Sequence, residues 1–320
     1  MFFSAFHVLV LSIVIAILYR PTYSGDPFKR ESTRPQRVLL VTAHPDDECL
    51  FFAPTIFGLA NGSQLNDASQ DGSIGQNNEN ELFSLCLSVG DADGLGHIRK
   101  EEYEKSLDVM GIKDTNRIAL DDPLENAQFR SRYLQDSMEV SWDVDYIADV
   151  VADFVIHHNI TTILSFDQGG VSDHPNHKII PFGIQRMISA YPVYPPPKFY
   201  VLITVPLSIK YVGILAPLVA KFDLYAMNML HSAEDRLSWS MEYFGYPYTT
   251  SAEGAKRNRE ETMPFFVAGI SDYLAALQAM RQHWSQLVWF RWLNVMFSRY
   301  MWVNEWAEVR MQAPDSYAIP

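Results

Sequence analysis

The chain has 320 residues, 48% of them hydrophobic, which is enough for one large domain with a sizeable core or for two small domains. Its formal net charge of −13 argues against a protein that binds nucleic acid by electrostatic attraction. The two cysteines, Cys49 and Cys86, cannot build a disulfide framework and stand in apolar stretches, so we expect two buried free thiols.

The N-terminal segment is apolar and differs from the rest of the chain. Residues 1–19 carry no formal charge, and a helix of this length spans roughly 28 Å, close to one hydrocarbon core. A cleaved signal peptide is the alternative, but the start lacks a basic residue and a small-x-small cleavage site. The excess of Lys and Arg after residue 19 indicates a cytosolic flank. We therefore predict a retained transmembrane anchor (1–19), a basic linker (20–36) and a cytosolic body.

From residue 37 the sequence alternates between strand and helix patterns. Short apolar, β-branched runs predict buried strands at 37–43, 81–89, 116–120, 161–167 and 198–205. Helical patterns cover 47–60, where Pro54 should interrupt the helix, and a segment that begins at Trp142. A third helical pattern covers 97–110 and should end at Gly111. This alternation predicts an α/β fold, a Rossmann-like, mostly parallel sheet with helices on both faces. Ligands bind such sheets beyond the carboxyl ends of the strands.

Three stretches of the predicted domain, residues 37–310, depart from this alternation. Residues 61–80 are almost entirely polar and predict a flexible insertion. Residues 201–220 are apolar but contain Lys210, which favours burial or shallow membrane contact, with a second span as the alternative. Residues 286–306 mix aromatic side chains with arginines, which predicts a helix with a buried or membrane-facing aromatic side.

Two short polar motifs directly follow predicted strands. "HPDD" begins at His44, and its first and last residues, three apart, can converge on one ion. "HPNH" begins at His174 and offers two more histidines at the same spacing. Three nitrogen and oxygen ligands are typical of catalytic Zn²⁺, with Fe²⁺ as the alternative metal. Asp46 is then a spare carboxylate, suited to act as a general base. Each motif alone is equally consistent with the start of a helix.

Together the motifs resemble the LmbE/PIG-L superfamily of zinc-dependent de-N-acetylases. "AHPDDE" at 43–48 and "GVSDHPNH" at 170–177 carry the resemblance, which extends over roughly residues 37–310. "GHIRKEE" at 96–102 adds to it, and the aromatic segment at 286–304 is similar to the eukaryotic branch of the family. The resemblance implies the fold and the metal described above.

The resemblance also implies a role for individual residues. The residues similar to the zinc ligands of the family are His44, Asp47 and His177. Asp46 matches its catalytic base, and His174 matches a histidine that stabilises the tetrahedral intermediate or protonates the leaving amine. Arg99 and Asp121 fall where the family binds sugar hydroxyls or phosphate, although surface charge is the alternative for both.

The eukaryotic branch removes acetate from N-acetylglucosaminyl-phosphatidylinositol in the second step of GPI-anchor synthesis, on the cytosolic face of the endoplasmic reticulum. By resemblance we expect the same reaction, a glycolipid substrate in the bilayer, and neither a nucleic acid nor a protein partner. Two alternatives are a deacetylase of a soluble GlcNAc conjugate and an inactive membrane scaffold. The apolar N-terminus argues against the first, and the two intact motifs argue against the second.

Neighbouring residues carry further expectations. Glu48 should orient His44 or cap a helix rather than bind metal. Asp173 should favour the imidazolium form of His174. The histidines outside the two motifs, among them His283, lack a partner motif and are expected to be structural or to lie on the surface.

Overall fold

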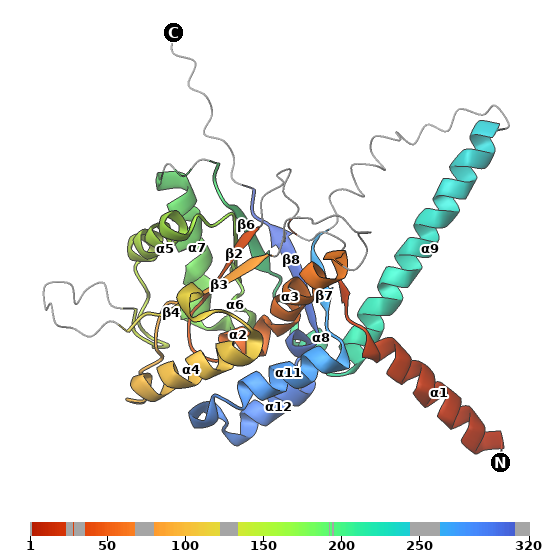
Figure 1. Ribbon diagram of the computed structural model, residues 1–320, viewed down its shortest axis with the longest axis horizontal. Helices are drawn as coiled ribbons and strands as arrows, with labels where there is room; N and C mark the ends of the chain where they lie inside the picture. The colour runs from red at the N-terminus through yellow and green to blue at the C-terminus, as the bar shows by residue number, and fades with distance from the viewer. Residues whose placement is uncertain are drawn as a thin grey trace, which may run out of the picture.

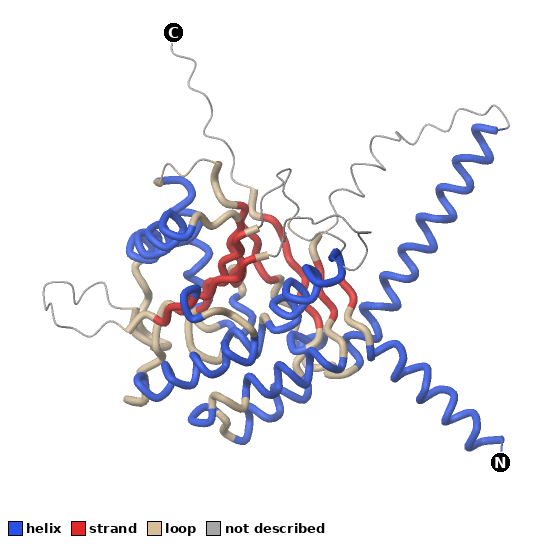
Figure 2. Tube along the Cα trace, viewed as in Figure 1, coloured by secondary structure: helices blue, strands red, loops and turns tan. Residues whose placement is uncertain are grey.

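Within the part of the chain that the structure describes, eight strands form one sheet with helices on both faces (Figures 1 and 2). This computed structural model describes residues 2–23, 28, 36–67, 80–121, 134–191, 193, 195–243 and 263–310. The strands lie in the order β1-β7-β8-β6-β5-β2-β3-β4. Their bounds are Thr22–Tyr23 (β1), Arg37–Thr42 (β2), Glu81–Cys86 (β3), Arg117–Ala119 (β4), Thr162–Phe166 (β5), Lys198–Leu202 (β6), Phe265–Val267 (β7) and Val303–Glu308 (β8).

The strands from β4 to β6 are parallel, as predicted. β2 pairs in parallel with β3 on one side and with β5 on the other, and β4 and β6 continue the sheet outward in the same direction. The chain leaves β2 for β3 and later returns to the opposite neighbour, β5. The carboxyl ends of β2 and β5 therefore flank a topological switch point, where open α/β sheets bind ligands. β8, β7 and β1 extend the far edge in antiparallel pairs.

The helices divide between the two faces of the sheet. Their bounds are Phe2–Tyr19 (α1), Asp47–Phe51 (α2), Ala53–Asp67 (α3), Gly96–Met110 (α4), Val144–His158 (α5), Gly170–Asp173 (α6), Pro175–Ala190 (α7), Leu207–Lys210 (α8), Leu215–Tyr243 (α9), Ile270–Met280 (α11) and Trp289–Phe297 (α12). Adjacent residues of β3 show the division, because successive side chains of a strand point to opposite faces. Phe83 contacts Phe154 of α5, whereas the hydroxyl of Ser84 bonds to that of Tyr103 in α4. α7 packs beside α5, and α11 packs beside α4.

Local sequence signals explain several helix boundaries. The Asp143 side chain accepts hydrogen bonds from the backbone N–H groups of Asp145 and Tyr146 and so caps the start of α5. α4 ends at Gly111, whose φ of 76° is favourable for glycine, as the sequence predicted. The predicted helix at 47–60 is interrupted at Phe52, two residues before Pro54, and forms α2 and α3 instead.

Two of the three stretches that interrupt the strand–helix alternation, residues 61–80 and 286–306, differ in secondary structure from what the sequence predicted. α3 continues to Asp67, so the expected insertion at 61–80 begins as helix, and residues 68–79 lie outside the described part of the chain. The prediction of one helix at 286–306 was wrong for its C-terminal end. There α12 is followed by a short 3₁₀ turn and then β8, because strand pairing with β6 and β7 buries Val303 and Trp306.

The third stretch, residues 201–220, splits into the end of β6, α8 and the start of α9. Lys210 is buried there and donates from Nζ to the carbonyl of Val171 at 2.8 Å. Several apolar side chains of the same stretch are exposed, however, among them Leu207 and Ile214, so burial does not extend to the whole stretch.

α1 projects from the domain (Figure 1). Many of its apolar side chains are exposed, among them Phe6, Leu9 and Ile13. Among the described residues, none of the helices combines the length and the apolar character needed to cross a membrane. The end of α1 packs on α11, where the Tyr19 carbonyl oxygen lies 2.6 Å from the position a Cβ would take on Gly269.

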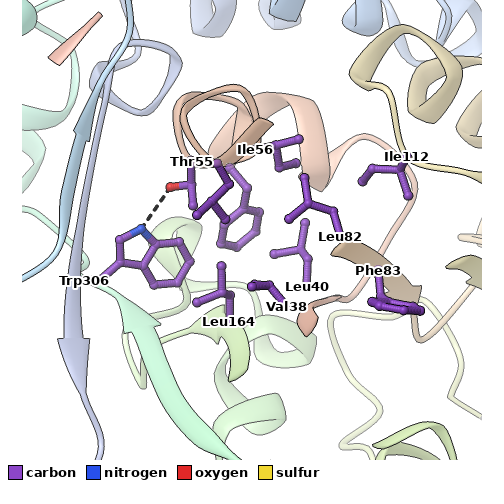
Figure 3. A pocket seen from close by; sticks show the side chains of 11 residues that line it. Val38, Leu40, Thr55, Ile56, Leu82, Phe83, Ile112, Leu164 and Trp306 are labelled. Atoms are coloured by element: carbon purple, nitrogen blue, oxygen red, sulfur yellow. Dashed lines mark hydrogen bonds between the residues drawn. The ribbon is translucent and has the colours of Figure 1, made fainter. Parts of the chain in front are cut away.

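The core between α3 and the sheet is apolar (Figure 3). Val38, Leu40 and Leu164 line a small pocket there, and Trp306 closes it by donating from Nε1 to Thr55 Oγ1 at 2.9 Å. Because none of the lining side chains is charged, this pocket belongs to the packing of the fold rather than to a site of chemistry.

A close approach of α5 and α7 gives a test of the fold. A Cβ on Gly183 would lie 2.3 Å from Ile147 Cγ2, nearer than real Cβ contacts. We expect Gly183→Ala to lower the free energy of unfolding by about 1–3 kcal/mol, although alanine is the better helix former. Denaturant unfolding measures this. Ser189→Ala, at an exposed position of α7, should be near neutral, and combining Gly183→Ala with Ile147→Ala should cost less than the sum of the two. Equal effects at 183 and 189 would contradict the packing.

Candidate active site

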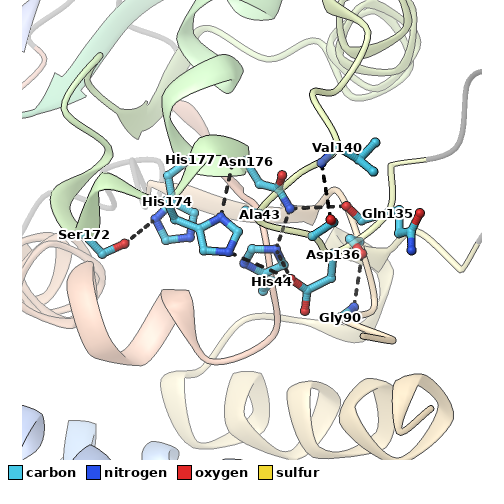
Figure 4. Close-up of polar contacts among 12 residues, drawn as sticks. Ala43, His44, Gly90, Gln135, Asp136, Val140, Ser172, His174, Asn176 and His177 are labelled. Atoms are coloured by element: carbon cyan, nitrogen blue, oxygen red, sulfur yellow. Dashed lines mark hydrogen bonds and ion pairs between the residues drawn. The ribbon is translucent and has the colours of Figure 1, made fainter. Parts of the chain in front are cut away.

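The two polar motifs meet at the carboxyl ends of β2 and β5 (Figure 4). His44 follows β2, and His174 and His177 lie at the start of α7, which follows β5. One nitrogen of each imidazole lies within 4.8 Å of the other two, so these histidines could share one ion. The convergence expected from sequence is therefore observed for all three.

Asp47 lies beside this cluster with both carboxylate oxygens engaged. Oδ2 accepts hydrogen bonds from the backbone N–H groups of Ala43 and His44, at 3.0 and 2.9 Å. Oδ1 lies 3.3 Å from His177 Nε2. Two ligand atoms of a tetrahedral Zn²⁺, each roughly 2.0–2.1 Å from the metal, stand about 3.3 Å apart, so this pair fits such an ion. Burial opposes ionisation, but His177 and His44 outweigh it and hold the pKa of Asp47 well below its usual range.

The backbone fixes the orientation of the His177 ring. Its Nδ1 lies 3.0 Å from the carbonyl oxygen of Gly170, a geometry in which Nδ1–H donates, and its Nε2 faces Asp47. The ring also stacks on Phe166, with 4.2 Å between centroids. A carbonyl that accepts from one imidazole nitrogen while the other faces a cation is the usual arrangement of a metal-binding histidine.

The Gly170 carbonyl belongs to a strained turn. Val171 has a φ of 58°, which is unfavourable for a β-branched residue. Its N–H donates to Thr204 Oγ1 at 2.9 Å, and its carbonyl accepts from Lys210 at 2.8 Å. These bonds hold the backbone in a conformation that presents Gly170 to His177.

His174 has the opposite tautomer. Its Nδ1 accepts the backbone N–H of Asn176 at 3.2 Å, so the proton of the neutral ring resides on Nε2. Burial, together with His44 and His177, lowers the pKa of His174 to about 4. At neutral pH the ring is therefore an uncharged hydrogen-bond donor, and its Nε2 lies 4.0 Å from Asp136 Oδ1.

Asp46 is buried and forms an ion pair that the sequence did not reveal. Its Oδ2 lies 2.9 Å from an Nη of Arg291, a residue of α12. Burial raises the pKa of Asp46, and the charge of Arg291 opposes this rise. Its backbone has a φ of 108°, and its N–H donates to Glu48 Oε2 at 3.0 Å. Arg291 stands in an aromatic segment far along the chain, where no local pattern marks it as part of the site.

Glu48 supports Asp46 rather than His44, which corrects the first of its two expected roles. Its Oε1 accepts from Ser106 Oγ and lies equally near His283 Nε2, both at 2.6 Å. His283 is buried, so its expected structural role is confirmed.

Cys49 lies close enough to Glu48 and His283 for the three side chains to form a second group of potential metal ligands. Burial, however, raises the pKa of Cys49 well above its usual value and keeps the thiol protonated.

Asp136 is a further carboxylate that the sequence did not single out. It lies 3.2 Å from His44 Nε2 through Oδ1, and 3.3 Å from Arg99 through Oδ2. Arg99 also donates to the carbonyls of Gly90 and Pro45, at 2.9 Å each. The structure therefore brings Arg99 to the site, where it braces the loops that carry His44 and Asp136.

Two predicted carboxylates lie outside the cluster. Within the described chain, Asp121 pairs with Lys100 at 3.3 Å and has no contact with the histidines. Asp173 is exposed and pairs with Lys178 at 2.7 Å. The expected action of Asp173 on His174 was wrong, because Asp136 is the carboxylate that faces that ring.

The chain is similar to known proteins over most of its length. A family model described as PIG-L, GlcNAc-PI de-N-acetylase, matches residues 39–188. The N-acetylglucosaminyl-phosphatidylinositol de-N-acetylase of Bos taurus is 34% identical over 268 residues, which cover 84% of this chain and 81% of the relative. The chain belongs to the PIG-L family. The protein of the same name from Arthroderma benhamiae is 30% identical over 300 residues, covering 84% of this chain and 86% of the relative.

Solved structures resemble the chain more distantly. N,N'-diacetylchitobiose deacetylase from Pyrococcus horikoshii is 13% identical with a TM-score of 0.47, covering 97% of this chain and 93% of that chain.

The PIG-L match at residues 39–188 includes both histidine motifs but ends before His283 and Arg291.

The buried ion pair of Asp46 can be tested through stability. Arg291→Met leaves the Asp46 carboxylate buried without a cation, and we expect the free energy of unfolding to fall by about 3 kcal/mol. Arg186→Met is the matched control, because Arg186 pairs with Asp145 at 2.8 Å on the surface, where solvent screens the pair and its loss should change stability little. Denaturant unfolding of both variants gives the comparison. Similar losses would show that the Arg291 pair contributes no more than a surface pair.

Proposed function

We propose that this protein is a metal-dependent deacetylase that converts N-acetylglucosaminyl-phosphatidylinositol to glucosaminyl-phosphatidylinositol, the second step of GPI-anchor biosynthesis. The observation that carries the proposal is the meeting of three histidines with Asp46 and Asp47 at the switch point of the sheet. Relatives named for this reaction match more than four fifths of the chain, which supports the same substrate here.

His44, Asp47 and His177 would hold the metal, with Zn²⁺ as the expected ion and Fe²⁺ as the alternative. Their donors are nitrogen and oxygen, which suit either ion. The 3.3 Å between Asp47 Oδ1 and His177 Nε2 and the tautomer of His177 support this set. When bound, the metal supplies a Lewis acid beside the amide carbonyl and acidifies nearby water.

Asp46 would act as the general base of hydrolysis. It takes a proton from the attacking water while a C–O bond forms at the acetyl carbon. The proton then passes to the sugar nitrogen as the C–N bond breaks, which yields acetate and a free amine. Arg291 holds the Asp46 carboxylate in place, and Glu48 holds its backbone. His174 would donate from Nε2–H to the oxyanion of the tetrahedral intermediate.

Arg99 and Asp121 are proposed contacts for sugar hydroxyls or phosphate. Arg99 lies at the edge of the cluster, next to Asp136, which supports its place near a substrate. Asp121 lies just beyond β4 with its carboxylate half-exposed, where it would accept from a sugar hydroxyl, and Lys100 beside it would pair with a phosphate.

We further propose that the chain acts at the endoplasmic reticulum membrane. α1, within residues 1–19, would be a single transmembrane anchor, joined by the basic linker 20–36 to a cytosolic deacetylase domain at 37–310. The apolar side chains that α1 exposes support this role, and so does the excess of Lys and Arg that follows it. An anchor would keep the active site beside a substrate whose acyl chains stay in the bilayer.

Loss of the proposed base gives the direct test. We expect Asp46→Asn to lower acetate release from N-acetylglucosaminyl-phosphatidylinositol by roughly 10²–10⁴-fold, because the amide cannot accept the proton. Metal content, measured by mass spectrometry on the same samples, should stay unchanged, and a chelator should stop the wild-type reaction. A wild-type protein that binds metal but releases acetate only from lipid-free GlcNAc conjugates would shift the proposal to a soluble substrate. No metal and no acetate would favour a scaffold.

Metal content also distinguishes the proposed ligand set from the alternative set. The proposed set is His44, Asp47 and His177, and the alternative is the three histidines. We expect Asp47→Ala and His177→Ala to lose the metal, with affinity falling by more than the roughly 10–100-fold cost of a lost supporting contact. His174→Ala should keep the metal and lose activity, because its ring donates to the oxyanion instead. Loss of metal in His174→Ala together with retention in Asp47→Ala would instead assign the ion to the three histidines.

A further inference from the structure

α12 has its apolar side chains on the outside. The side chains that it exposes are Trp289, Phe290, Trp292, Leu293, Met296 and Phe297, with Trp289 75% and Leu293 45% exposed. Its inward face consists of Arg291, Asn294 and the buried Val295. A helix on a water-soluble surface shows the reverse arrangement, with polar residues outward. A contiguous exposed apolar patch of this kind marks a surface that contacts a membrane or another molecule.

The patch continues onto the segment around α8. The Gly213 N–H donates to the carbonyl of Phe297 at 2.8 Å, which joins the two segments. Leu207, Ile209 and Ile214 are exposed on this second segment, Leu207 by 73%. We call the exposed apolar side chains of α12 and of residues 207–214 the apolar surface.

The segments that form the apolar surface carry no acidic residue, although the whole chain has a net charge of −13. Residues 281–304 contain three arginines, of which Arg281 is exposed, while Arg291 and Arg299 pair with Asp46 and Glu305. Residues 206–222 contain two lysines, and both donate to backbone carbonyl groups. These two segments therefore offer no carboxylate that would repel a phosphate headgroup. Tryptophan, tyrosine and aliphatic side chains combined with basic residues are typical of helices that lie in a membrane interface.

The apolar surface is connected to both α1 and the catalytic carboxylate. α11 links it to α1, because the hydroxyl of Tyr273 donates to the Val295 carbonyl at 3.3 Å while Gly269 contacts the end of α1. In Figure 1, α1 leaves the domain on the side where α11 and α12 lie. On its inward face, α12 sends Arg291 to Asp46 at 2.9 Å. A bilayer against this surface would thus meet the domain directly over the site.

We propose that the apolar surface lies in the headgroup region of a phospholipid bilayer and brings the active site to substrates held there. The contact itself follows from the exposed aromatic and aliphatic side chains and from the lack of carboxylates among them, while its role in catalysis rests on the proposed function. α12 is thus a second attachment to the membrane, independent of α1.

Spin labels test the contact in the full chain reconstituted into nanodiscs of phosphatidylcholine with a minor fraction of phosphatidylinositol. The native thiols, Cys49 and Cys86, are fully buried, so a label would react with an introduced cysteine. At Leu293→Cys we expect the label to be more accessible to oxygen, which concentrates in lipid, than to a water-soluble nickel chelate. Ile156→Cys is the matched control, because Ile156 is exposed on α5, on the other face of the sheet. There the chelate should reach the label more readily.

Two results would overturn the proposal. Equal chelate access at positions 293 and 156 would place α12 in water. Protection of position 293 from both reagents would place a protein there, and broadening of its spectrum by spin–spin coupling would identify a second copy of the chain.

Activity separates this proposal from the proposed function. We expect Trp289→Ser combined with Leu293→Ser to lower acetate release from bilayer N-acetylglucosaminyl-phosphatidylinositol by roughly tenfold, and to leave release from lipid-free N-acetylglucosaminyl-inositol phosphate unchanged. An equal loss on both substrates would show that α12 acts on the site and not through the membrane. If the wild-type chain cleaves neither substrate, the proposed function fails, while the spin-label result still decides the contact.

Discussion

The parallel pairing of β2 with β5 is the constraint on which the site depends. Leu40 of β2 lies opposite Leu164 of β5, so both strands end at the same edge of the sheet. The loops that follow them carry residues separated by more than a third of the chain, and strand pairing alone brings His44 beside His174. Because the strands are buried on both faces, a one-residue slip of register would move every side chain to the opposite face, where it would meet helices that do not fit it. The stability of the core therefore also fixes the geometry of the cluster.

Hydrogen bonds then give chemically equal side chains different roles. His174 and His177 are three residues apart on one helix, but a backbone N–H contacts Nδ1 of the first and a carbonyl contacts Nδ1 of the second. The first ring therefore presents an Nε2–H donor, whereas the second has its Nδ1 engaged by the backbone and turns Nε2 toward Asp47. The adjacent Asp46 and Asp47 differ in the same way: the first faces Arg291 and the second faces His177. Position in the backbone, rather than residue type, decides which group can bind a cation and which can move a proton.

Sequence patterns predicted the parts of the molecule that local rules determine. The strands, the end of α4 at Gly111 and the two motifs follow from apolar periodicity, glycine conformation and residue spacing. Arg291, His283 and Asp136 could not be found in this way, because each reaches the site through tertiary packing from a segment with no motif of its own. The misassigned end of 286–306 has a related cause. Its aromatic residues suit a helix equally well, and only the neighbouring β6 and β7 make Val303–Glu308 a strand.

Several residues that support the active site lie in the C-terminal part of the chain, which limits how far the enzyme can be truncated. The region matched by the family model, residues 39–188, contains both motifs. Without the rest of the chain, however, Asp46 and Glu48 would each lose a cationic partner, Arg291 and His283. The turn that orients His177 would also lose Thr204 and Lys210. The smallest unit able to do this chemistry is thus larger than the segment that identifies it, and the C-terminal third is as much a part of the catalyst as the motifs are.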